Sequence, residues 1–121
     1  MSHAGGHSSR EENRMIARIW RGITLATKAE QYLEYLNRIV IPVCQRAEGN
    51  KGLFVMKEPQ GELMQFLLLT FWASHEALEK FAGADGEAVN PTPEEKSLLV
   101  AFESNARHYN VICAPEHLPP K

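Results

Sequence analysis

The clearest pattern along the chain is an apolar run that passes directly into a segment with helical spacing. Residues 63–72 read LMQFLLLTFW, and Ala77, Leu78 and Phe81 follow at helical intervals. The run is typical of a buried strand, and the later spacing is typical of an amphipathic helix. Ser74 stands between them, where its hydroxyl can accept a hydrogen bond from a first-turn N–H group. The sequence therefore predicts a strand ending at Trp72 and a helix capped by Ser74.

The first part of the chain repeats this order. Residues 15–25 alternate in the manner of a strand, so two faces separate. One carries Met15, Ala17, Ile19, Arg21, Ile23 and Leu25, and the other carries Ile16, Arg18, Trp20 and Thr24. Thr27 with Glu30 forms a capping-box pattern, which predicts the start of a long helix. Pro42 should loosen that helix, and Gly49 should terminate it.

The rest of the chain supplies a hairpin, a short helix and a closing strand. Residues 52–58 predict a strand that pairs with 63–72 across the turn Pro59-Gln60-Gly61. Breaks at 83–86 and 90–93 precede a helical piece that starts at Thr92 or Pro93 and continues through Phe102. Residues 107–113 predict the last strand. We expect one domain over residues 14–113, with tails at 1–13 and 114–121.

This order predicts an α+β fold of the ferredoxin-like βαββαβ type, a four-stranded antiparallel sheet with both main helices on one face. Such a sheet leaves its other face open. Because the strands carry apolar groups on both faces, the open face needs a cover. A second copy of the chain can provide it, so the sequence predicts a homodimer that closes as an α/β barrel.

Composition narrows the possible partners. A formal charge of −2 over 121 residues gives no field that would favour nucleic acid or an anionic membrane. No apolar stretch approaches the roughly 20 residues that span a bilayer, and the start of the chain lacks a signal-peptide pattern. Cys44 and Cys113 are too far apart for a metal knuckle, and they are interpreted as free thiols in a reducing cytoplasm. His3 and His7 lie in the predicted tail without a rigid frame for a metal.

Several segments together form a recognisable set. The most specific part is Thr70-x-Trp72-x-Ser74 followed by Phe81-Ala82-Gly83. The other segments are IARIWRG (16–22), YLEYL (32–36) with Ile41-Pro42, GNKGL (49–53) and HYNV (108–111). With these segments the chain resembles the antibiotic biosynthesis monooxygenase-type domain of the dimeric α/β-barrel superfamily, over about residues 15–112.

The resemblance implies a small, often aromatic or polyketide-like ligand in a cavity between sheet and helices. Some members oxidise such substrates with dioxygen and no cofactor, some degrade haem, and many have no known activity. The haem-degrading branch uses an Asn in the first strand and a His beyond the tryptophan. This chain has Trp20 and Val89 at or near those positions. Haem degradation is therefore less well supported, and no cofactor or metal is predicted.

Six residues are the candidates for a site. His108 and Arg18 are the candidate catalytic groups, His108 as a general base and Arg18 as a holder of an anionic oxygen. The candidate substrate-binding residues are Trp20, Phe66, Thr70 and Trp72. Each has a structural alternative. Trp72 can be core, His108 can be a hydrogen-bonded structural residue, and Arg18 can form a salt bridge with Glu58 or Glu103.

Two functions of different class remain open. One is a cofactor-independent monooxygenase or related enzyme acting on an aromatic or polyketide-like compound. The other is a non-catalytic ligand-binding or structural dimer of the same fold. The third strand separates Met64, Phe66, Leu68, Thr70 and Trp72 from Leu63, Gln65, Leu67, Leu69 and Phe71. The sequence leaves open which of these sets faces the helices.

Overall fold

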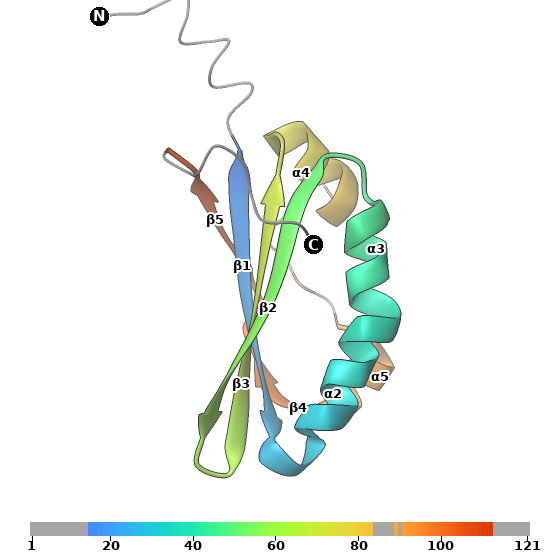
Figure 1. Ribbon diagram of the computed structural model, residues 1–121, viewed down its shortest axis with the longest axis vertical. Helices are drawn as coiled ribbons and strands as arrows, with labels where there is room; N and C mark the ends of the chain where they lie inside the picture. Colours follow the sequence, from blue (N-terminus) through green and yellow to red (C-terminus); the bar gives the residue numbers. More distant parts are fainter. Residues whose placement is uncertain (1–14, 84–88, 90, 113–121) are drawn as a thin grey trace, which may run out of the picture.

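The computed structural model describes residues 15–83, 89 and 91–112. Helical segments connect the strands of one sheet (Figure 1). The elements are β1 (Ile16–Leu25), η1 (Ala26–Lys28), α2 (Ala29–Tyr35), η2 (Leu36–Val40), α3 (Ile41–Arg46), β2 (Asn50–Gln60), β3 (Leu63–Trp72), α4 (His75–Ala82), α5 (Pro93–Leu98), β4 (Leu99–Phe102) and β5 (Arg107–Asn110). The predicted tails lie outside the described residues.

A single antiparallel sheet organises these elements in the order β2-β3-β1-β4, and β5 also pairs with β1. β4 and β5 share one edge of β1, β4 beside Gly22–Thr24 and β5 beside Ile16–Ile19. The strand predicted over residues 107–113 is present as β5, and β4 is a further segment that the sequence did not predict as a strand. The ferredoxin-like α+β fold class is confirmed.

One boundary differs from the sequence prediction. The helix expected to continue to Phe102 ends at Leu98, and Leu99–Phe102 form β4. The backbone N–H and C=O groups at the edge of β1 near Gly22 form hydrogen bonds with β4. If the helix had continued to Phe102, these groups would have lacked those partners. Tertiary pairing therefore decides a short segment whose spacing fits both structures.

The helix caps agree in two cases out of three. Ser74 Oγ accepts from the Ala77 N–H at 3.1 Å, and Thr92 Oγ1 accepts from the Glu95 N–H at 3.1 Å. Thr27 does not cap a helix, because it lies inside the 3₁₀ turn η1 and α2 begins at Ala29. The loosening expected near Pro42 is seen as η2, a π-helical segment directly before α3. Pro42 has no N–H group, and the wider turn accommodates that loss.

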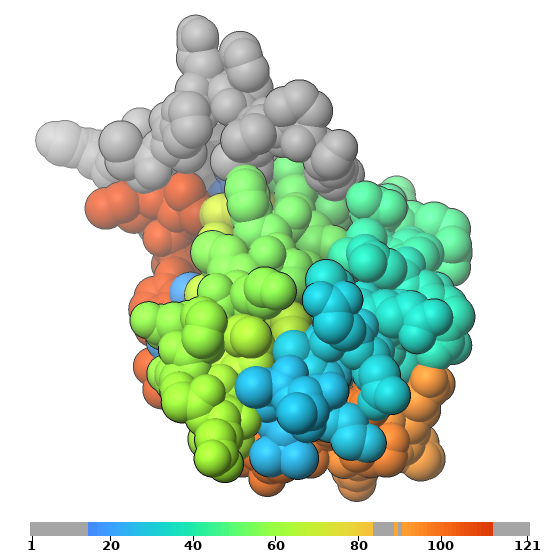
Figure 2. Space-filling view, turned by 60° about the horizontal axis from the view of Figure 1, so that its bottom comes forward, coloured from blue at the N-terminus to red at the C-terminus, as the bar shows by residue number. Residues whose placement is uncertain are grey.

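The helices cover one face of the sheet, and the described residues place no helix on the other (Figure 1). At one end, η1 lies between the β2–β3 hairpin and the helices, and α5 lies beside α2 (Figure 2). The covered face holds two apolar clusters. One gathers Ala29, Tyr32, Tyr35, Leu36 and Phe66, and the other gathers Ile16, Trp72 and Leu78.

These clusters settle which set of β3 side chains faces the helices. Phe66 and Trp72 belong to these clusters and are fully buried beneath the helices. Met64, Leu68 and Thr70 alternate in step with them along β3, so this set of side chains faces the helices. The strand register then places Arg18 and Trp20 of β1 on the covered face as well.

The open face carries the complementary set. Ile19, Leu69 and Phe54 are register partners across β1, β3 and β2, and they form a row of half-buried apolar groups. Phe54 also meets Phe71 edge to face, with ring centroids 6.1 Å apart. An apolar sheet face of this kind is typical of an interaction surface.

Candidate functional site

A cavity of about 130 Å³ lies between the sheet and the helices. Strand β1 contributes Arg18 and Trp20 to its wall, and β3 contributes Leu68 and Thr70. The helical side and the connecting segment contribute Val40, Cys44, Phe81, Val89 and Glu95. The wall therefore combines apolar side chains with a guanidinium, a carboxyl, a thiol and a hydroxyl.

Arg18 brings a positive charge into this space. Its position on the covered face of β1 draws the guanidinium out of water, and this burial lowers the pKa of Arg18. The nearby Cys44 partly offsets that shift. Arginine nevertheless stays protonated in proteins, so the group remains a fork of hydrogen-bond donors for an anionic oxygen.

Cys44 is buried on α3 and its thiol is free. Burial raises the pKa of Cys44, and the charge of Arg18 acts in the opposite direction. Because burial is the larger effect, the group is held as a neutral thiol rather than as a thiolate nucleophile. The prediction of a free Cys44 is confirmed, and Cys113 lies outside the described residues.

Trp20 forms a flat aromatic part of the wall. Its Nε1 donates to the carbonyl oxygen of Glu103 at 2.6 Å, and its ring lies 6.3 Å from that of Phe102. Gly22 leaves room for this orientation, because a Cβ there would lie 2.9 Å from the Trp20 ring. The wall position of Trp20 thus depends on a glycine two residues along the same strand face.

Two other predicted binding residues are not among the described residues of the wall. Trp72 and Phe66 are both fully buried, and neither is among the described residues that line the cavity. Trp72 Nε1 donates to Thr70 Oγ1 at 2.9 Å, and Thr70 does line the cavity. Trp72 therefore supports the wall through Thr70.

His108 lies beside Arg18 without forming part of the described wall. The two residues are register partners on β5 and β1, so their side chains emerge on the same face of the sheet. His108 is partly buried there. Its role as a general base stays a prediction.

Neither carboxylate suggested as a salt-bridge partner of Arg18 is placed on the face that Arg18 occupies. Glu103 Oε2 lies 3.6 Å from Arg21 and 3.6 Å from Arg107, both of which the register places on the open face. Glu58 accepts from Gln65 at the surface. The parity of β1 separates Arg18 from this surface network.

Glu95 is the wall residue that the sequence pattern did not single out. It is 8% exposed, and its Oε2 accepts from the hydroxyl of the fully buried Tyr32 at 2.7 Å. The available signal was Thr92-x-x-Glu95, a capping-box spacing that predicts a helix start and no position in a cavity.

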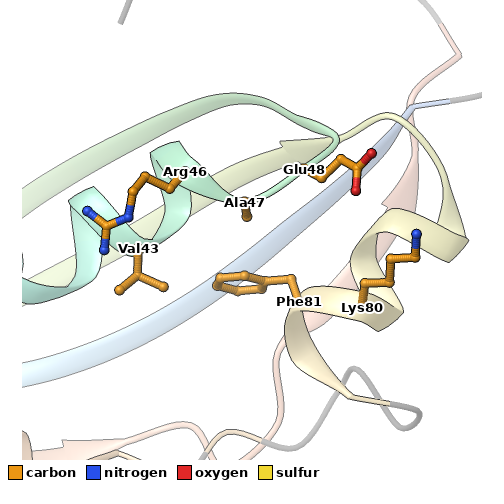
Figure 3. Close-up of a pocket in the computed structure, with 6 residues that line it drawn as sticks. All are labelled: Val43, Arg46, Ala47, Glu48, Lys80 and Phe81. Atoms are coloured by element: carbon orange, nitrogen blue, oxygen red, sulfur yellow. The ribbon is translucent and has the colours of Figure 1, made fainter.

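A second, more open hollow of about 350 Å³ lies between α3 and α4. Figure 3 shows its residues: Val43, Arg46, Ala47 and Glu48 on one side, Lys80 and Phe81 on the other. The Phe81 ring extends into the gap between the two helices (Figure 3). Phe81 lines both this outer groove and the inner cavity of about 130 Å³.

Haem does not fit the inner cavity. Trp20 and Val89, which stand near the positions of the polar groups in the haem-degrading branch, both line it, and no described lining residue is a histidine. Its volume of about 130 Å³ is close to the roughly 150 Å³ that holds a single benzene ring, which is too small for a porphyrin. In the described part of the chain, no group of three or more His, Cys, Asp or Glu side chains is arranged to hold a metal ion.

Comparison with solved structures identifies the same architecture. A putative antibiotic biosynthesis monooxygenase from Bacillus cereus matches with a TM-score of 0.58 and 13% identity, over 84% of this chain and 96% of that chain. SnoaB from Streptomyces nogalater, described as a cofactor-independent oxygenase, matches with a TM-score of 0.55 and 14% identity, over 88% and 98%. A dimeric ferredoxin-like protein from an uncultured marine organism matches with a TM-score of 0.62 and 13% identity, over 90% and 96%.

These matches confirm the fold predicted from the sequence. The chain has the ferredoxin-like fold of antibiotic biosynthesis monooxygenase-like proteins, and at 12–16% identity the likeness extends to the fold alone. No family model matches the sequence, and no curated protein matches it. None of the described helices is long and apolar enough to cross a membrane.

Proposed function

We propose that this chain is a cofactor-independent monooxygenase that acts on an aromatic or polyketide-like compound in the cavity between sheet and helices. The observation that carries the proposal is that Arg18 and Trp20, two residues apart on the same face of β1, both line the cavity. An aromatic wall orients a planar ring, and the guanidinium stabilises the anion of its ionised hydroxyl. SnoaB, which shares this fold, is described as a cofactor-independent oxygenase, and this likeness favours the proposal. The fold alone does not determine the reaction.

The reaction needs an electron-rich substrate and dioxygen. Loss of the O–H proton gives a phenolate or enolate, which passes electrons to dioxygen. At the activated carbon a CH₂ group becomes C=O, one atom of dioxygen enters the product, and the other leaves as water. In this proposal Arg18 holds the anionic oxygen. His108, the register partner of Arg18, stays a candidate general base for this reaction.

The proposal includes a homodimer. The row of Ile19, Leu69 and Phe54 on the open face would be buried against the same row of a second copy. Apolar burial stabilises association by roughly 25 cal/mol for each Å² removed from water. One of the similar structures is described as dimeric, which agrees with this arrangement.

The test is turnover with isotopically labelled dioxygen. Purified protein is incubated with a series of phenols and quinols, and oxygen uptake is followed together with the label in the product. Arg18→Leu should lower kcat/KM at least about tenfold, because a hydrogen bond to a charged group contributes about 1.5–3 kcal/mol. Arg21→Leu is the matched control, since Arg21 lies on the opposite face of the same strand.

The competing function is a ligand-binding or structural dimer without catalysis. Saturable binding of the same compounds without oxygen uptake would establish that function and overturn the enzyme. Equal loss of activity in both arginine variants would remove Arg18 from the mechanism.

A further inference from the structure

Glu95 is a carboxyl group built into the cavity wall. It is the third residue of α5, its N–H donates to Thr92 Oγ1 at 3.1 Å, and its side chain is hydrogen-bonded by the Thr92 backbone. This reciprocal pair forms a capping box. A capping carboxylate usually faces solvent, whereas Glu95 is 8% exposed and lines the cavity.

Tyr32 fixes the orientation of that carboxyl group. The Tyr32 hydroxyl donates to Oε2 at 2.7 Å, and its ring stacks on Tyr35 with centroids 6.2 Å apart. The Tyr35 hydroxyl in turn lies 2.8 Å from Thr92 Oγ1. A carboxylate has about four lone-pair positions, so the contacts from Tyr32 and Thr92 leave about two positions for further proton donors.

Glu95 and Arg18 give the cavity opposite charges on separate elements, α5 and β1. A ligand with an acidic O–H group suits both, because the carboxylate can take the proton and the guanidinium can bind the oxygen that is left. Burial raises the pKa of Glu95, and the charge of Arg18 would lower the pKa of a bound phenol. Both effects bring the pKa of the bound phenol and the pKa of Glu95 closer together, which favours proton transfer between them.

The volume of the cavity limits the ligand. At about 130 Å³ it is close to the roughly 150 Å³ of an apolar cavity that holds one benzene ring. Phe81 lines this cavity and also the outer groove, so its side chain lies at the boundary of both. The inner space therefore suits a single ring, and a multi-ring compound requires that Phe81 move.

We propose that Glu95 accepts the hydroxyl proton of a single-ring phenol or enol bound in this cavity, with Arg18 receiving the oxygen anion. The O–H bond breaks, its electron pair stays on the ligand oxygen, and the Glu95 carboxylate becomes a carboxylic acid. Tyr32 is a positioning residue, since it acts through Glu95. This inference rests on the proposed function for its ligand, and it requires no oxidant.

Binding of para-nitrophenol tests the step without turnover. The experiment uses a pH below the nitrophenol's own pKa, where the free ligand is neutral, and absorbance reports the phenolate. Calorimetry in two buffers of different ionisation enthalpy counts the protons that binding releases. For the wild-type protein we expect the phenolate spectrum with no net proton released, because the proton stays on Glu95.

Glu95→Gln is the decisive variant, because a glutamine also completes a capping box. It should lose the bound phenolate spectrum or release about one proton on binding. Glu94→Gln is the matched control: the neighbouring carboxylate is exposed and bonded to Arg38 at the surface. Tyr32→Phe should retain binding and raise the bound phenolate fraction, because the lost hydrogen bond lowered the Glu95 pKa.

The inference is overturned if wild-type protein does not bind single-ring phenols, if its binding releases one proton to the buffer, or if Glu95→Gln matches wild type in both readouts. The outcome is separable from the proposed function. Proton capture by Glu95 without oxygen uptake would support this inference and refute the monooxygenase. Oxygen uptake that is unchanged in Glu95→Gln would do the reverse.

Discussion

The Trp72 indole donates a 2.9 Å hydrogen bond to the hydroxyl of Thr70, two residues earlier on the same face of β3. Trp72 also packs on Phe81, with ring centroids 4.6 Å apart. The tryptophan thus holds one cavity residue through a hydrogen bond and another through ring contact. Its effect on a ligand is indirect, through the shape of the wall.

Replacing Trp72 should therefore cost stability first. Trp72→Ala should lower the free energy of unfolding by about 3–5 kcal/mol, because it empties a fully buried ring site. Trp72→Phe should cost less, since part of the ring volume remains. Urea unfolding measures both, and His75→Ala, at an exposed position in the same region, should stay within about 0.5 kcal/mol of wild type. A Trp72→Ala protein of unchanged stability would contradict this structural role.

Phe81 should control the size of ligand that the cavity admits. Phe81→Ala should join the inner cavity to the groove between α3 and α4, so that two-ring phenols bind at least about tenfold more tightly than to wild type, a gain of about 1.4 kcal/mol. Leu78→Ala is the control, because Leu78 is fully buried on the same helix and does not belong to the described cavity wall. Titration calorimetry with one-ring and two-ring phenols measures the selectivity. An equal gain in both variants would mean that general loosening, and not the Phe81 ring, sets the size limit.

A charge at the centre of the open sheet face should prevent pairing of two copies. Leu69 lies between Ile19 and Phe54 in the register, so Leu69→Lys would place an ammonium group in the proposed interface. Sedimentation should show wild type as a dimer and the variant at the single-chain mass of 13.6 kDa. Val43→Lys, at an exposed aliphatic position on α3, should remain dimeric. A monomeric wild-type protein would exclude the homodimer.

The free energy of unfolding should depend on pH through the protonation of Glu95. Burial raises its pKa in the folded chain, so the folded state binds this proton more tightly than the unfolded state does. The corresponding stability is fully present below the ordinary glutamate pKa, about 4.3, and is lost as pH rises through the raised folded value. The groups facing Glu95 do not titrate in this range: burial raises the pKa of Tyr32 and of Cys44 further, and Arg18 stays charged.

Urea unfolding of wild type and Glu95→Gln across that pH range measures this effect. The stability of wild type relative to the variant should decrease with rising pH, while Glu94→Gln should track wild type. A difference that grows with pH would show that the Thr92 and Tyr32 hydrogen bonds outweigh burial and lower the Glu95 pKa instead.

Much of the fold could be predicted from the sequence because the local patterns agreed with the tertiary packing. Alternation over residues 16–25 and the apolar run at 63–72 identify the two central strands, and Ser74 identifies the start of α4. Residues 99–102 were misassigned because a helix and an edge strand compete there, and pairing with β1 decides between them. Thr27 failed as a cap because a 3₁₀ turn precedes α2.

The candidate site could be predicted only in part. Parity placed Arg18 and Trp20 on one face of β1, and both line the cavity. Glu95 was missed because its partner Tyr32 lies 63 residues away in the chain, and no local spacing reports such a contact.

The sequence by itself determined the order of strands and helices and the division of each strand into two faces, because these depend on neighbours within a few residues. Only the tertiary structure decided which face the helices cover, that Trp72 donates a hydrogen bond to Thr70, and that Arg18 and Glu95 share one cavity. Those outcomes depend on packing between segments distant in the chain. The free energy of burial is set by the assembled layers and not by any one of them alone.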